Sequence, residues 1–469
     1  MPPSTSRTLS IPELRSAVHG RLITPDDADY DAARTVAAGG IDRRPAVIVR
    51  VADAADVQYV VNLARETGME LAVRSGGHSG LGHGVTEGGI VIDLRDMKAI
   101  EIDPERRTAW AETGLTAREV TEAAAAHGLA IGFGDTGSVG IGGLTTGGGV
   151  GYFVRKDGLT IDNVLAAEIV TADGQLRSVD AETDPALFWG IRGGGGNFGV
   201  VTRFLYRLHD LPSFVGGMLV LPATAEVVAG FIAAAEAAPE ALSTICNVMN
   251  CPPMPNVPEE YHGELVILAF MAFAGDAEAG ERGMAPFRGL ATPLVDEVKP
   301  ISYPEIYPPD VEDESYHPTV AGFTMFLDTI DDDVAKTIVE YLEASDAPMR
   351  AAQLRVLGGA MARVPRDATA FAHRASRIMA IGVALYEGEE ERLVRQDWVE
   401  RFAADLRQGV EGAYVNFVGD EGEAGVRAAY PGKTWDRLAA LKARYDPTNL
   451  FRLNQNIPPA SAAGTDGPG

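Results

Sequence analysis

The sequence predicts an α+β protein made of a glycine-rich part and a glycine-poor part. Strands and helices alternate through the first 208 residues, three glycine-rich segments interrupt that alternation, and the composition changes near Leu211. The chain has 469 residues, which at roughly 150 residues per domain fits two or three domains. Apolar residues make up 46% and charged residues 23% of the chain, as in ordinary globular proteins.

The first part is expected to begin with a β-α-β unit. Residues 46–51 read as an apolar strand, residues 54–67 have helical spacing and end at Gly68, and residues 71–74 read as the next strand. The elements that follow are strands at 90–94, 99–103, 108–112, 164–171, 176–179 and 200–208, and helices at 116–127 and 185–190. A turn at Asp173-Gly174 predicts a hairpin. Residues 132–151 contain too much glycine for a regular element to be expected there.

The part after Leu211 is expected to form an antiparallel sheet backed by helices on one face. Proline becomes frequent and the glycine clusters stop. The predicted elements are strands at 217–221, 265–273, 353–357 and 378–386, and helices at 225–237, 332–344 and 389–407. From Tyr414 to Pro458 the texture changes again, with Tyr, Asn and Pro near the end.

The formal charge of −26 at pH 7 excludes some classes of partner. An acidic chain repels the phosphates of a nucleic acid and the anionic surface of a membrane, so neither is an expected partner. Cys246 and Cys251 are the only cysteines and form no CxxC pattern, so a disulfide scaffold is excluded. The first 18 residues lack an export signal, and no apolar run reaches the ~18 residues that span a bilayer. We therefore expect a cytoplasmic monomer or homodimer.

The three glycine-rich segments predict a site for a phosphate-bearing ligand. They are residues 74–82, 137–151 and 193–199, and each adjoins a strand. Glycine lets backbone N–H groups approach a phosphate with no Cβ in the way. The alternative is that the three segments are only tight turns. That alternative would account well for a single glycine-rich segment but less well for three.

Other motifs for nucleotides, metals and hydrolysis fit poorly. Gly194-x-Gly196-x-x-Gly199 precedes a strand, whereas the dinucleotide motif links a strand to a helix. Gly432-Lys433-Thr434 resembles the end of a P-loop, but Arg427 occupies the upstream glycine position. The eight histidines have neither HxH nor HExxH spacing, so we expect no metal site, and there is no GxSxG elbow.

His78 lies in the first glycine segment, directly after a strand, where a lone imidazole has little core to pack against. It is either a functional residue or a loop histidine that forms hydrogen bonds, for example in a polar pair with His83. The residues alone leave these alternatives open.

Several motifs in the right order resemble the vanillyl-alcohol oxidase superfamily, whose members have a PCMH-type FAD-binding domain. They are Arg74-Ser-Gly-Gly-His78, Gly142-Gly143, Gly147-Gly-Gly149, Arg155-x-x-Gly158 and Asp162-Asn163. The segment Tyr445-Asp-Pro-Thr-Asn-Leu-Phe-Arg-Leu-Asn-Gln-Asn-Ile-Pro458 is similar to the C-terminal signature of the berberine-bridge-enzyme-like branch. The resemblance extends from about Asp26 to Pro458.

The resemblance implies a two-lobed FAD-binding domain from residues 1–208 and 412–469, with a substrate-binding domain at 209–411. It also implies that His78 is bonded to the 8α-methyl group of FAD. The cofactor-binding residues expected on this basis are Arg74, Ser75, Gly76, Gly77, His78, Ser79, Gly82, His83, Gly137, Ser138, Gly142, Gly143, Thr146, Gly147, Gly148, Gly151, Tyr152, Asp162, Val200, Val201, Asn454 and Asn456.

One departure from the family pattern bears on the covalent attachment. Many relatives carry a second link, through a cysteine in a Val-Gly-x-Gly-Gly-His segment. In this chain the cysteine position is Thr136 and the histidine position is Leu144. We therefore expect a single link, through His78. Doubly linked relatives typically have an open site for oligosaccharides, so that class of substrate is disfavoured.

The catalytic candidates come from segments that the resemblance places near the flavin. They are Tyr414, Asn416, Gln353 and Tyr152. A strand would put Tyr414 and Asn416 on one face, and Gln353 with Arg355 on one face of another strand. Relatives often carry a carboxylate where this chain has Gln353. Tyr152 either approaches the flavin or packs beneath the glycine segment, and both readings stay open.

The resemblance implies an FAD-dependent oxidase that removes a hydride from a small organic substrate and reduces O₂ to H₂O₂. The substrate would be a secondary-metabolite alcohol, an amine or a polyketide-like intermediate. The alternatives are a dehydrogenase with another electron acceptor, a carbohydrate oxidase, and a catalytically silent flavin-binding protein.

Overall fold

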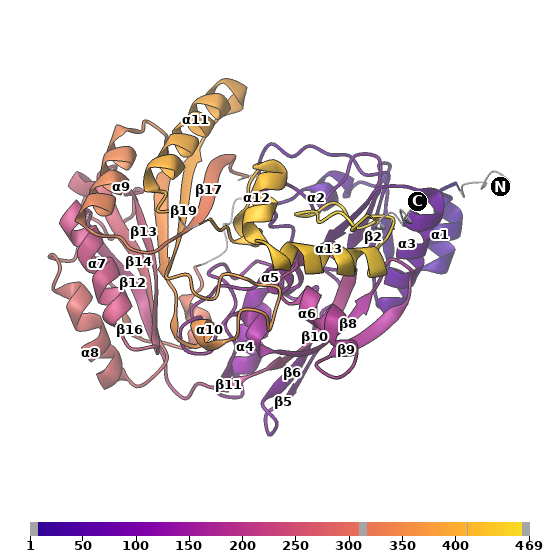
Figure 1. Cartoon of the computed structure of the whole chain (residues 1–469), viewed down its shortest axis with the longest axis horizontal. Coiled ribbons are helices and arrows are strands. Elements are labelled where there is room, and N and C mark those ends of the chain that lie inside the picture. Colours follow the sequence, from indigo (N-terminus) through magenta and orange to yellow (C-terminus); the bar gives the residue numbers. More distant parts are fainter. Residues whose placement is uncertain (1–7, 309–316, 410, 462–469) are drawn as a thin grey trace, which may run out of the picture.

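The computed structural model describes residues 8–308, 317–409 and 411–461. Figure 1 shows two halves side by side, and segments from both ends of the chain make up one of them. The indigo and magenta segments form that half together with the yellow C-terminal helices α12 (Gly422–Ala429) and α13 (Lys433–Tyr445). The middle of the chain forms the other half.

A four-stranded sheet of order β1-β2-β4-β3 comes first along the chain. Strands β2 and β3 both run parallel to β4; helix α3 connects β2 to β3, and residues 75–89 connect β3 to β4. The Asp53 carboxylate accepts bonds from the backbone N–H groups of Ala55 and Asp56 at the start of α3, and Gly68 ends the helix with a φ of 70°. The elements are α1 Ile11–Ala17, β1 Arg21–Ile23, α2 Tyr30–Arg34, β2 Val47–Arg50, α3 Ala54–Thr67, β3 Leu71–Arg74 and β4 Ile90–Asp93.

A five-stranded antiparallel sheet of order β5-β6-β10-β8-β9 follows. Its elements and the helices beside it are β5 Ile100–Asp103, β6 Thr108–Glu112, α4 Ala117–Ala125, α5 Ile141–Gly147, β8 Val164–Val170, β9 Leu176–Asp180, α6 Pro185–Ile191 and β10 Val200–Arg207. Two short strands, β7 Leu129–Ala130 and β11 His209–Asp210, pair with each other.

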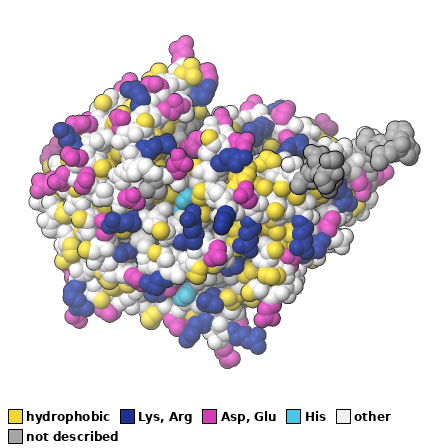
Figure 2. Space-filling view, viewed as in Figure 1, with side chains coloured by type: hydrophobic (Ala, Val, Ile, Leu, Met, Phe, Trp, Pro, Cys, Tyr) yellow, Lys and Arg dark blue, Asp and Glu magenta, His cyan; other side chains and the backbone are white. Residues whose placement is uncertain are grey.

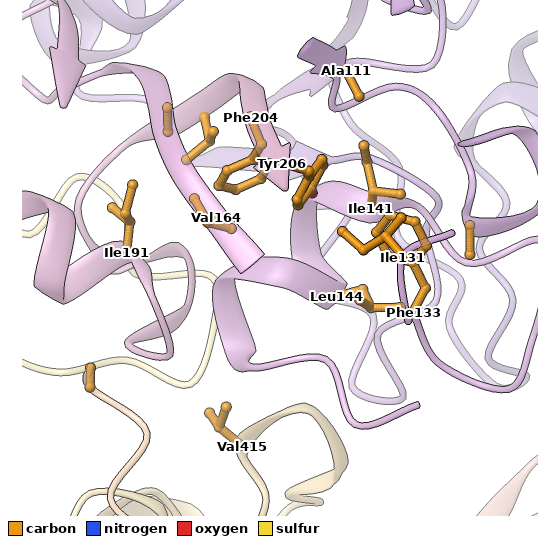
Figure 3. Packing of buried hydrophobic residues seen from close by; sticks show 14 of the residues in the cluster. Ala111, Ile131, Phe133, Ile141, Leu144, Val164, Ile191, Phe204, Tyr206 and Val415 are labelled. Atoms are coloured by element: carbon orange, nitrogen blue, oxygen red, sulfur yellow. The ribbon is translucent and has the colours of Figure 1, made fainter. Parts of the chain in front are cut away.

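The core between this sheet and α5 also contains residues from the end of the chain. Figure 3 shows Phe204 and Tyr206 of β10 near Ile141 and Leu144 of α5, and Val415 belongs to the same buried cluster. Burial of this apolar surface is what holds the late segment against the early one.

The middle of the chain forms an eight-stranded antiparallel sheet of order β15-β12-β14-β13-β18-β19-β17, with β16 beside β12. Its strands are β12 Val215–Pro222, β13 Leu242–Asn250, β14 Leu265–Phe273, β15 Val295–Asp296, β16 Lys299–Pro300, β17 Val320–Leu327, β18 Arg350–Val356 and β19 Ile378–Leu385. Figure 1 shows the helices on one side of this sheet, and they are α7 Ala225–Ala237, α8 Ala277–Arg288, α9 Asp332–Ala344 and α11 Gly388–Leu406. Leu354 and Val356 of β18 pack with these helices, so Gln353 and Arg355 point to the opposite face.

Several predicted elements have the predicted bounds, among them the helices at 54–67, 225–237 and 332–344 and the strand at 265–273. Among the elements that were not predicted from the sequence are β13, β17, α8 and α13. No helix among the described residues has both the length and the apolar character needed to cross a lipid bilayer.

Two local predictions were wrong. The glycine-rich region does contain a regular element, α5, because burial of Ile141 and Leu144 outweighs the poor helix propensity of its glycines. Tyr414 and Asn416 do not lie in a strand, since residues 415–417 form a single 3-10 turn that begins after Tyr414.

Candidate active site

A cleft with about 420 Å³ of water-accessible space brings together segments from across the chain. Its walls come from residues 71–84, 134–150, 195–201, 414–418 and 451–455, with Arg355 from β18. Both apolar and polar groups line it, as is usual for a cofactor or ligand site.

The first two glycine segments touch each other, backbone to backbone, at this cleft. A Cβ on Gly140 would lie 2.2 Å from the backbone N of Gly76, and a Cβ on Gly76 would lie 2.3 Å from the N of Gly140. The Ser75 hydroxyl donates to the Thr113 carbonyl at 2.5 Å and accepts from the N–H of Gly142 at 3.3 Å. Glycine at 76 and 140 is therefore a requirement of the close approach of the two segments.

Arg74 anchors the first segment from beneath. Its guanidinium is buried, donates to the Asp93 carboxylate at 2.8 Å and also donates to the carbonyls of Ala33 and Thr35. Burial lowers the pKa of Arg74, and Asp93 opposes that shift. The residue fixes the loop, and its charge is neutralised there.

The two histidines of this segment have different surroundings. His78 is exposed at the cleft, whereas His83 is half-buried in its wall. Burial, with a smaller effect of the Arg43 charge, lowers the pKa of His83 to about 4. His83 is therefore neutral at physiological pH.

Tyr414 lies at the cleft with its ring 3% exposed. Its phenolic oxygen accepts two hydrogen bonds, from the N–H of Gly149 at 2.8 Å and from the Asn416 amide at 3.0 Å. Burial raises the pKa of Tyr414, and these two donors, together with the charge of Arg355, oppose that rise only in part. The charge of Arg355 favours the phenolate, but burial outweighs it, so Tyr414 is a neutral phenol at rest.

Arg355 joins the eight-stranded sheet to both sides of the second glycine region. It donates to the Asp135 carboxylate at 2.5 Å, to the Val150 carbonyl at 3.0 Å and to the Gln353 side-chain oxygen at 2.6 Å. The side chain of Arg355 is 4% exposed and that of Asp135 is 26% exposed. An ion pair, in which the two opposite charges offset each other, therefore lies at the cleft.

The C-terminal segment reaches the cleft through a buried ion pair. Lys442 donates to the Asp446 carboxylate at 2.7 Å and to the carbonyls of Asn197 and Phe451, and Asp446 in turn accepts from the N–H of Leu450. These bonds hold the chain that carries Asn454 against the third glycine segment.

Many residues predicted to contact cofactor or substrate line the cleft. They are Arg74, Ser75, Gly76, Gly77, His78, Ser79, His83, Gly142, Gly143, Thr146, Val200, Val201, Tyr414, Asn416 and Asn454. The others lie outside its lining, and they are Gly82, Gly137, Ser138, Gly147, Gly148, Gly151, Tyr152, Asp162, Gln353 and Asn456.

The positions of these other residues have physical reasons. A Cβ on Gly151 would lie 1.1 Å from the Phe133 carbonyl oxygen, so this glycine serves chain packing. Asp162 accepts a two-pronged ion pair from Arg374, with both bonds at 2.7 Å. Gln353 accepts a hydrogen bond from Arg355, which lines the cleft, but Gln353 does not line the cleft itself.

Tyr152 is buried in an aromatic cluster, 6.2 Å from the ring of Tyr307, and burial raises the pKa of Tyr152 well above its usual range. Its position matches the packing alternative rather than contact with the cleft.

The sequence analysis missed Asp135, Leu94, Phe417 and Gln455, all of which line the cleft. Asp135 carried a usable signal, since it directly precedes Thr136, at the family's second attachment position. Nothing in the sequence paired it with Arg355.

In the described part of the chain, one group of possible metal ligands comes together, at His19, Asp53 and Asp56. Asp53 already accepts the N–H groups that begin α3, and Asp56 accepts from the N–H groups of His19, Gly20 and Ala52. These bonds explain the group as a structural junction, and none of its three residues lines the cleft.

Comparisons with known proteins agree with this geometry. A family model described as an FAD binding domain matches residues 45–180, and one described as berberine and berberine like matches residues 413–458. The chain is 30% identical to (R)-6-hydroxynicotine oxidase of Paenarthrobacter nicotinovorans over 460 residues, which cover 94% of this chain and 97% of that protein. The chain belongs to the berberine-bridge-enzyme-like FAD-linked oxidoreductases.

This family lies in the vanillyl-alcohol oxidase superfamily, and the structures agree. The crystal structure of 6-hydroxy-D-nicotine oxidase from Arthrobacter nicotinovorans superimposes with a TM-score of 0.85 at 29% identity, over 96% of this chain and 99% of that one. Another relative is a xylooligosaccharide oxidase of Thermothelomyces thermophilus, 27% identical over 89% of this chain and 88% of that protein. The predicted family and fold class are confirmed.

The cleft fits the FAD of this oxidoreductase family. Gly77, Gly142 and Gly143 line the cleft without side chains, so a pyrophosphate can approach the main chain there. The side-chain oxygen of Asn454, which lines the cleft, is buried and has no partner among the described residues, so it is ready to accept a bond from a ligand.

Proposed function

We propose that this protein oxidises a small organic substrate on an FAD that is covalently attached to His78, and that O₂ reoxidises the enzyme. The convergence of His78, the glycine segments and Tyr414 on a single cleft carries the proposal. Residues expected to bind the cofactor and residues expected to bind the substrate line the same cleft. This supports direct hydride transfer from the substrate to the cofactor. Bound FAD supplies the hydride acceptor for this reaction.

His78 is exposed on a loop whose backbone is fixed on both sides. Arg74 anchors the loop from below, and the contact between Gly76 and Gly140 fixes it from the side. A fixed imidazole at the cleft suits covalent attachment, since the bond then forms at one place on the cofactor. This supports the link proposed from the family resemblance.

Attachment through a second residue has no support in this chain. Thr136 and Leu144 both line the cleft, at the positions where relatives carry a cysteine and a histidine, and neither side chain has a group that could bond to the flavin in that way. Cys246 and Cys251 are both buried, and burial raises the pKa of each thiol. A single link therefore follows.

Tyr414 is the proposed group that handles the substrate proton. Gly149 and Asn416 donate to its oxygen, so the hydroxyl proton of Tyr414 is left to point elsewhere. The same two donors would stabilise a phenolate once that proton leaves. Asn416 also donates to the Leu144 carbonyl at 3.1 Å, which holds the pair against α5.

The organisation proposed for the chain has residues 1–208 and 412–469 around the FAD and residues 209–411 around the substrate. The eight-stranded sheet uses only strands between residues 215 and 385, which supports this division. A dehydrogenase that avoids O₂ on the same scaffold is the second candidate, since it needs the same cleft.

The attachment is tested by denaturing the protein in acid and analysing its peptides by mass spectrometry. The precipitate should stay yellow, and the peptide that contains His78 should gain the mass of one FAD. The His78→Ala variant should release its flavin on denaturation. His83→Ala, five residues away in the same loop, and Cys246→Ser should retain it. A flavin-cysteine adduct, or a colourless wild-type precipitate, would overturn the proposal.

The oxidase activity is tested by anaerobic reduction with a panel of alcohols, amines and sugars, followed by admission of air. Rapid return of the oxidised spectrum with one H₂O₂ for each flavin is expected. Slow return in air together with fast return on adding a quinone would favour the dehydrogenase.

A further inference from the structure

One face of the eight-stranded sheet continues from the cleft on the side opposite to α7, α9 and α11. Alternate residues of β18 and β13 point to this face, among them Gln353, Arg355 and Asn247. Arg355 lines the cleft itself, and its guanidinium lies 5.6 Å from the ring of Phe417, which also lines it. A molecule in the cleft therefore meets this face at Arg355, and Gln353 and Asn247 lie farther along it, half-buried and outside the cleft lining.

A chain of hydrogen bonds leads along the face from Arg355. The guanidinium donates to the oxygen of Gln353, the amide of Gln353 donates to the oxygen of Asn247 at 2.9 Å, and the amide of Asn247 donates to the Leu268 carbonyl at 3.0 Å. In each of these hydrogen bonds the donor is the residue nearer to Arg355 and the acceptor is the residue farther from it. Each of the two amides has two N–H groups, and among the described residues only one of each pair has an acceptor.

Thr324 lies in the same cross-strand row. The register places Thr324 opposite Ile381 and Ile381 opposite Gln353, so the three side chains share one face. The Thr324 hydroxyl is buried and has no partner in the part of the chain that the structure describes. It is a further hydrogen-bonding group without a protein partner.

The surroundings of these polar groups are apolar. Half-buried residues on the same face of the sheet are Met218, Met249, Phe270, Ile381 and Val383. Such side chains present dispersion contacts to a flat, apolar molecule and few groups for the many hydroxyls of a sugar.

This region also lacks a carboxylate for a cation. The sequences of β12, β13, β14, β17, β18 and β19 contain no Asp or Glu. Among the described residues that line the cleft, Asp135 is the one acid, and Arg355 already pairs with it. A buried ammonium ion without a carboxylate would be costly.

We propose that the substrate is a neutral, largely apolar molecule that presents an oxygen acceptor to the amides of Gln353 and Asn247. A protonated amine fits the site poorly, because the groups open to it are donors polarised by Arg355. An oligosaccharide finds too few polar partners. This inference rests on the proposed oxidase function of the cleft.

The experiment compares two ligands with the same carbon skeleton, acetonaphthone and naphthylethylamine. Their binding to the holoenzyme is measured by calorimetry under argon at pH 7. The ketone should bind at least about tenfold more tightly than the ammonium ion, as expected when one ligand leaves a buried polar group unpaired. Equal binding, tighter binding of the amine, or no binding of the ketone would overturn the proposal.

A pair of variants on one strand tests the residues. Asn247→Asp keeps an acceptor for Gln353 and adds a carboxylate to the cleft face, so the ketone-to-amine ratio should fall about tenfold. Asn250→Asp adds the same charge on the opposite face of β13 and should leave the ratio unchanged. Equal changes in both variants would count against the assignment.

A second measurement does not depend on how the variants fold. In the wild type, amine binding should strengthen as rising pH produces the neutral amine, and ketone binding should stay flat. An amine affinity that is independent of pH would contradict the proposal. Calorimetry reports binding only, so failure of the proposed oxidase function would appear separately, in the mass and peroxide measurements.

Discussion

On the side of α5 the cleft is walled by main chain, whereas on the side of β18 it is walled by side chains. Gly76 and Gly140 bring two backbones together so closely that neither position has room for a methyl group. On the other side Arg355 lines the cleft with a long side chain, and Gln353 and Asn247 continue from it in a hydrogen-bonded row outside the lining. The first wall depends on the absence of side chains and suits a cofactor shared by the family, while the second can change residue by residue with the substrate.

The two walls also manage charge differently. His83 in the first wall loses its charge, because burial lowers its pKa to about 4. Arg355 in the second wall forms an ion pair with Asp135. Acid therefore disturbs the first wall, because it protonates the buried His83. Removal of Asp135 disturbs the second wall, because it leaves the guanidinium of Arg355 without a carboxylate.

The largest effect is expected from a methyl group in the main-chain wall. Gly140→Ala places a Cβ 2.2 Å from the N of Gly76 and the Oγ of Ser75, so the loops must separate. We expect loss of bound flavin and a fall in the free energy of unfolding of about 3 kcal/mol or more. Urea unfolding and flavin absorbance measure both.

The matched control is Gly143→Ala, in the same helix α5. Nothing lies within 4 Å of its added Cβ, and alanine has the better helix propensity, so stability should be retained. If both variants lost stability equally, the close contact would not be the reason that glycine is needed.

The next largest effect is expected at the boundary of the two walls. Tyr414→Phe removes the proposed proton-handling group and should slow flavin reduction by about 10²–10⁴. Because burial raises the pKa of Tyr414, the wild-type rate should increase with pH toward the alkaline range, while the Phe variant stays flat. Rapid mixing under argon gives both rates, and a variant within about threefold of wild type would remove Tyr414 from the chemistry.

A smaller effect is expected from the side-chain wall. Asp135→Asn leaves the buried guanidinium of Arg355 without its carboxylate, which should lower the free energy of unfolding by about 2–3 kcal/mol, less than for a fully buried pair. Asp103→Asn, which breaks an exposed pair with Arg106, should cost well under about 1 kcal/mol. Similar losses in the two variants would show that the cleft pair has no special weight.

The smallest effect concerns pH. The folded-state pKa of His83 lies near 4, below its unfolded value of 6.5, so the unfolded state binds more protons in between. Stability from this group is complete above pH 6.5 and is lost as the pH falls toward 4. His83→Gln should reduce that acid loss by about 1–2 kcal/mol in unfolding measurements at the two pH values. An unchanged pH profile would mean that His83 does not stay neutral.

The main-chain wall was largely predictable from the sequence, because it requires glycine and glycine can be read directly from the sequence. Clusters of glycine next to strands indicate close backbone approach wherever they occur, and the segments around Gly76 and Gly142 line the cleft as expected. The helix α5 was missed because three of its seven residues are glycine, and tertiary packing rather than propensity forms it.

The side-chain wall was predictable only in part. The two-residue spacing correctly put Gln353 and Arg355 on one face. The pairing of Arg355 with Asp135, and of Gln353 with Asn247, depends on which strands become neighbours. Strand β13 was missed because its alternation includes polar residues on both faces, so Asn247 could not be placed. Tyr414 was placed at the cleft by family resemblance, although its local turn was wrongly read as a strand.

The buried pair of Lys442 and Asp446 has a consequence for how the protein is made in the cell. It holds the residues around Asn454 against the third glycine segment, and these are among the last parts of the cleft to be synthesised. A nascent chain still on the ribosome therefore has the first glycine segment but only part of the site. Stable flavin binding is therefore expected only once residues 442–455 have emerged and packed against the third glycine segment.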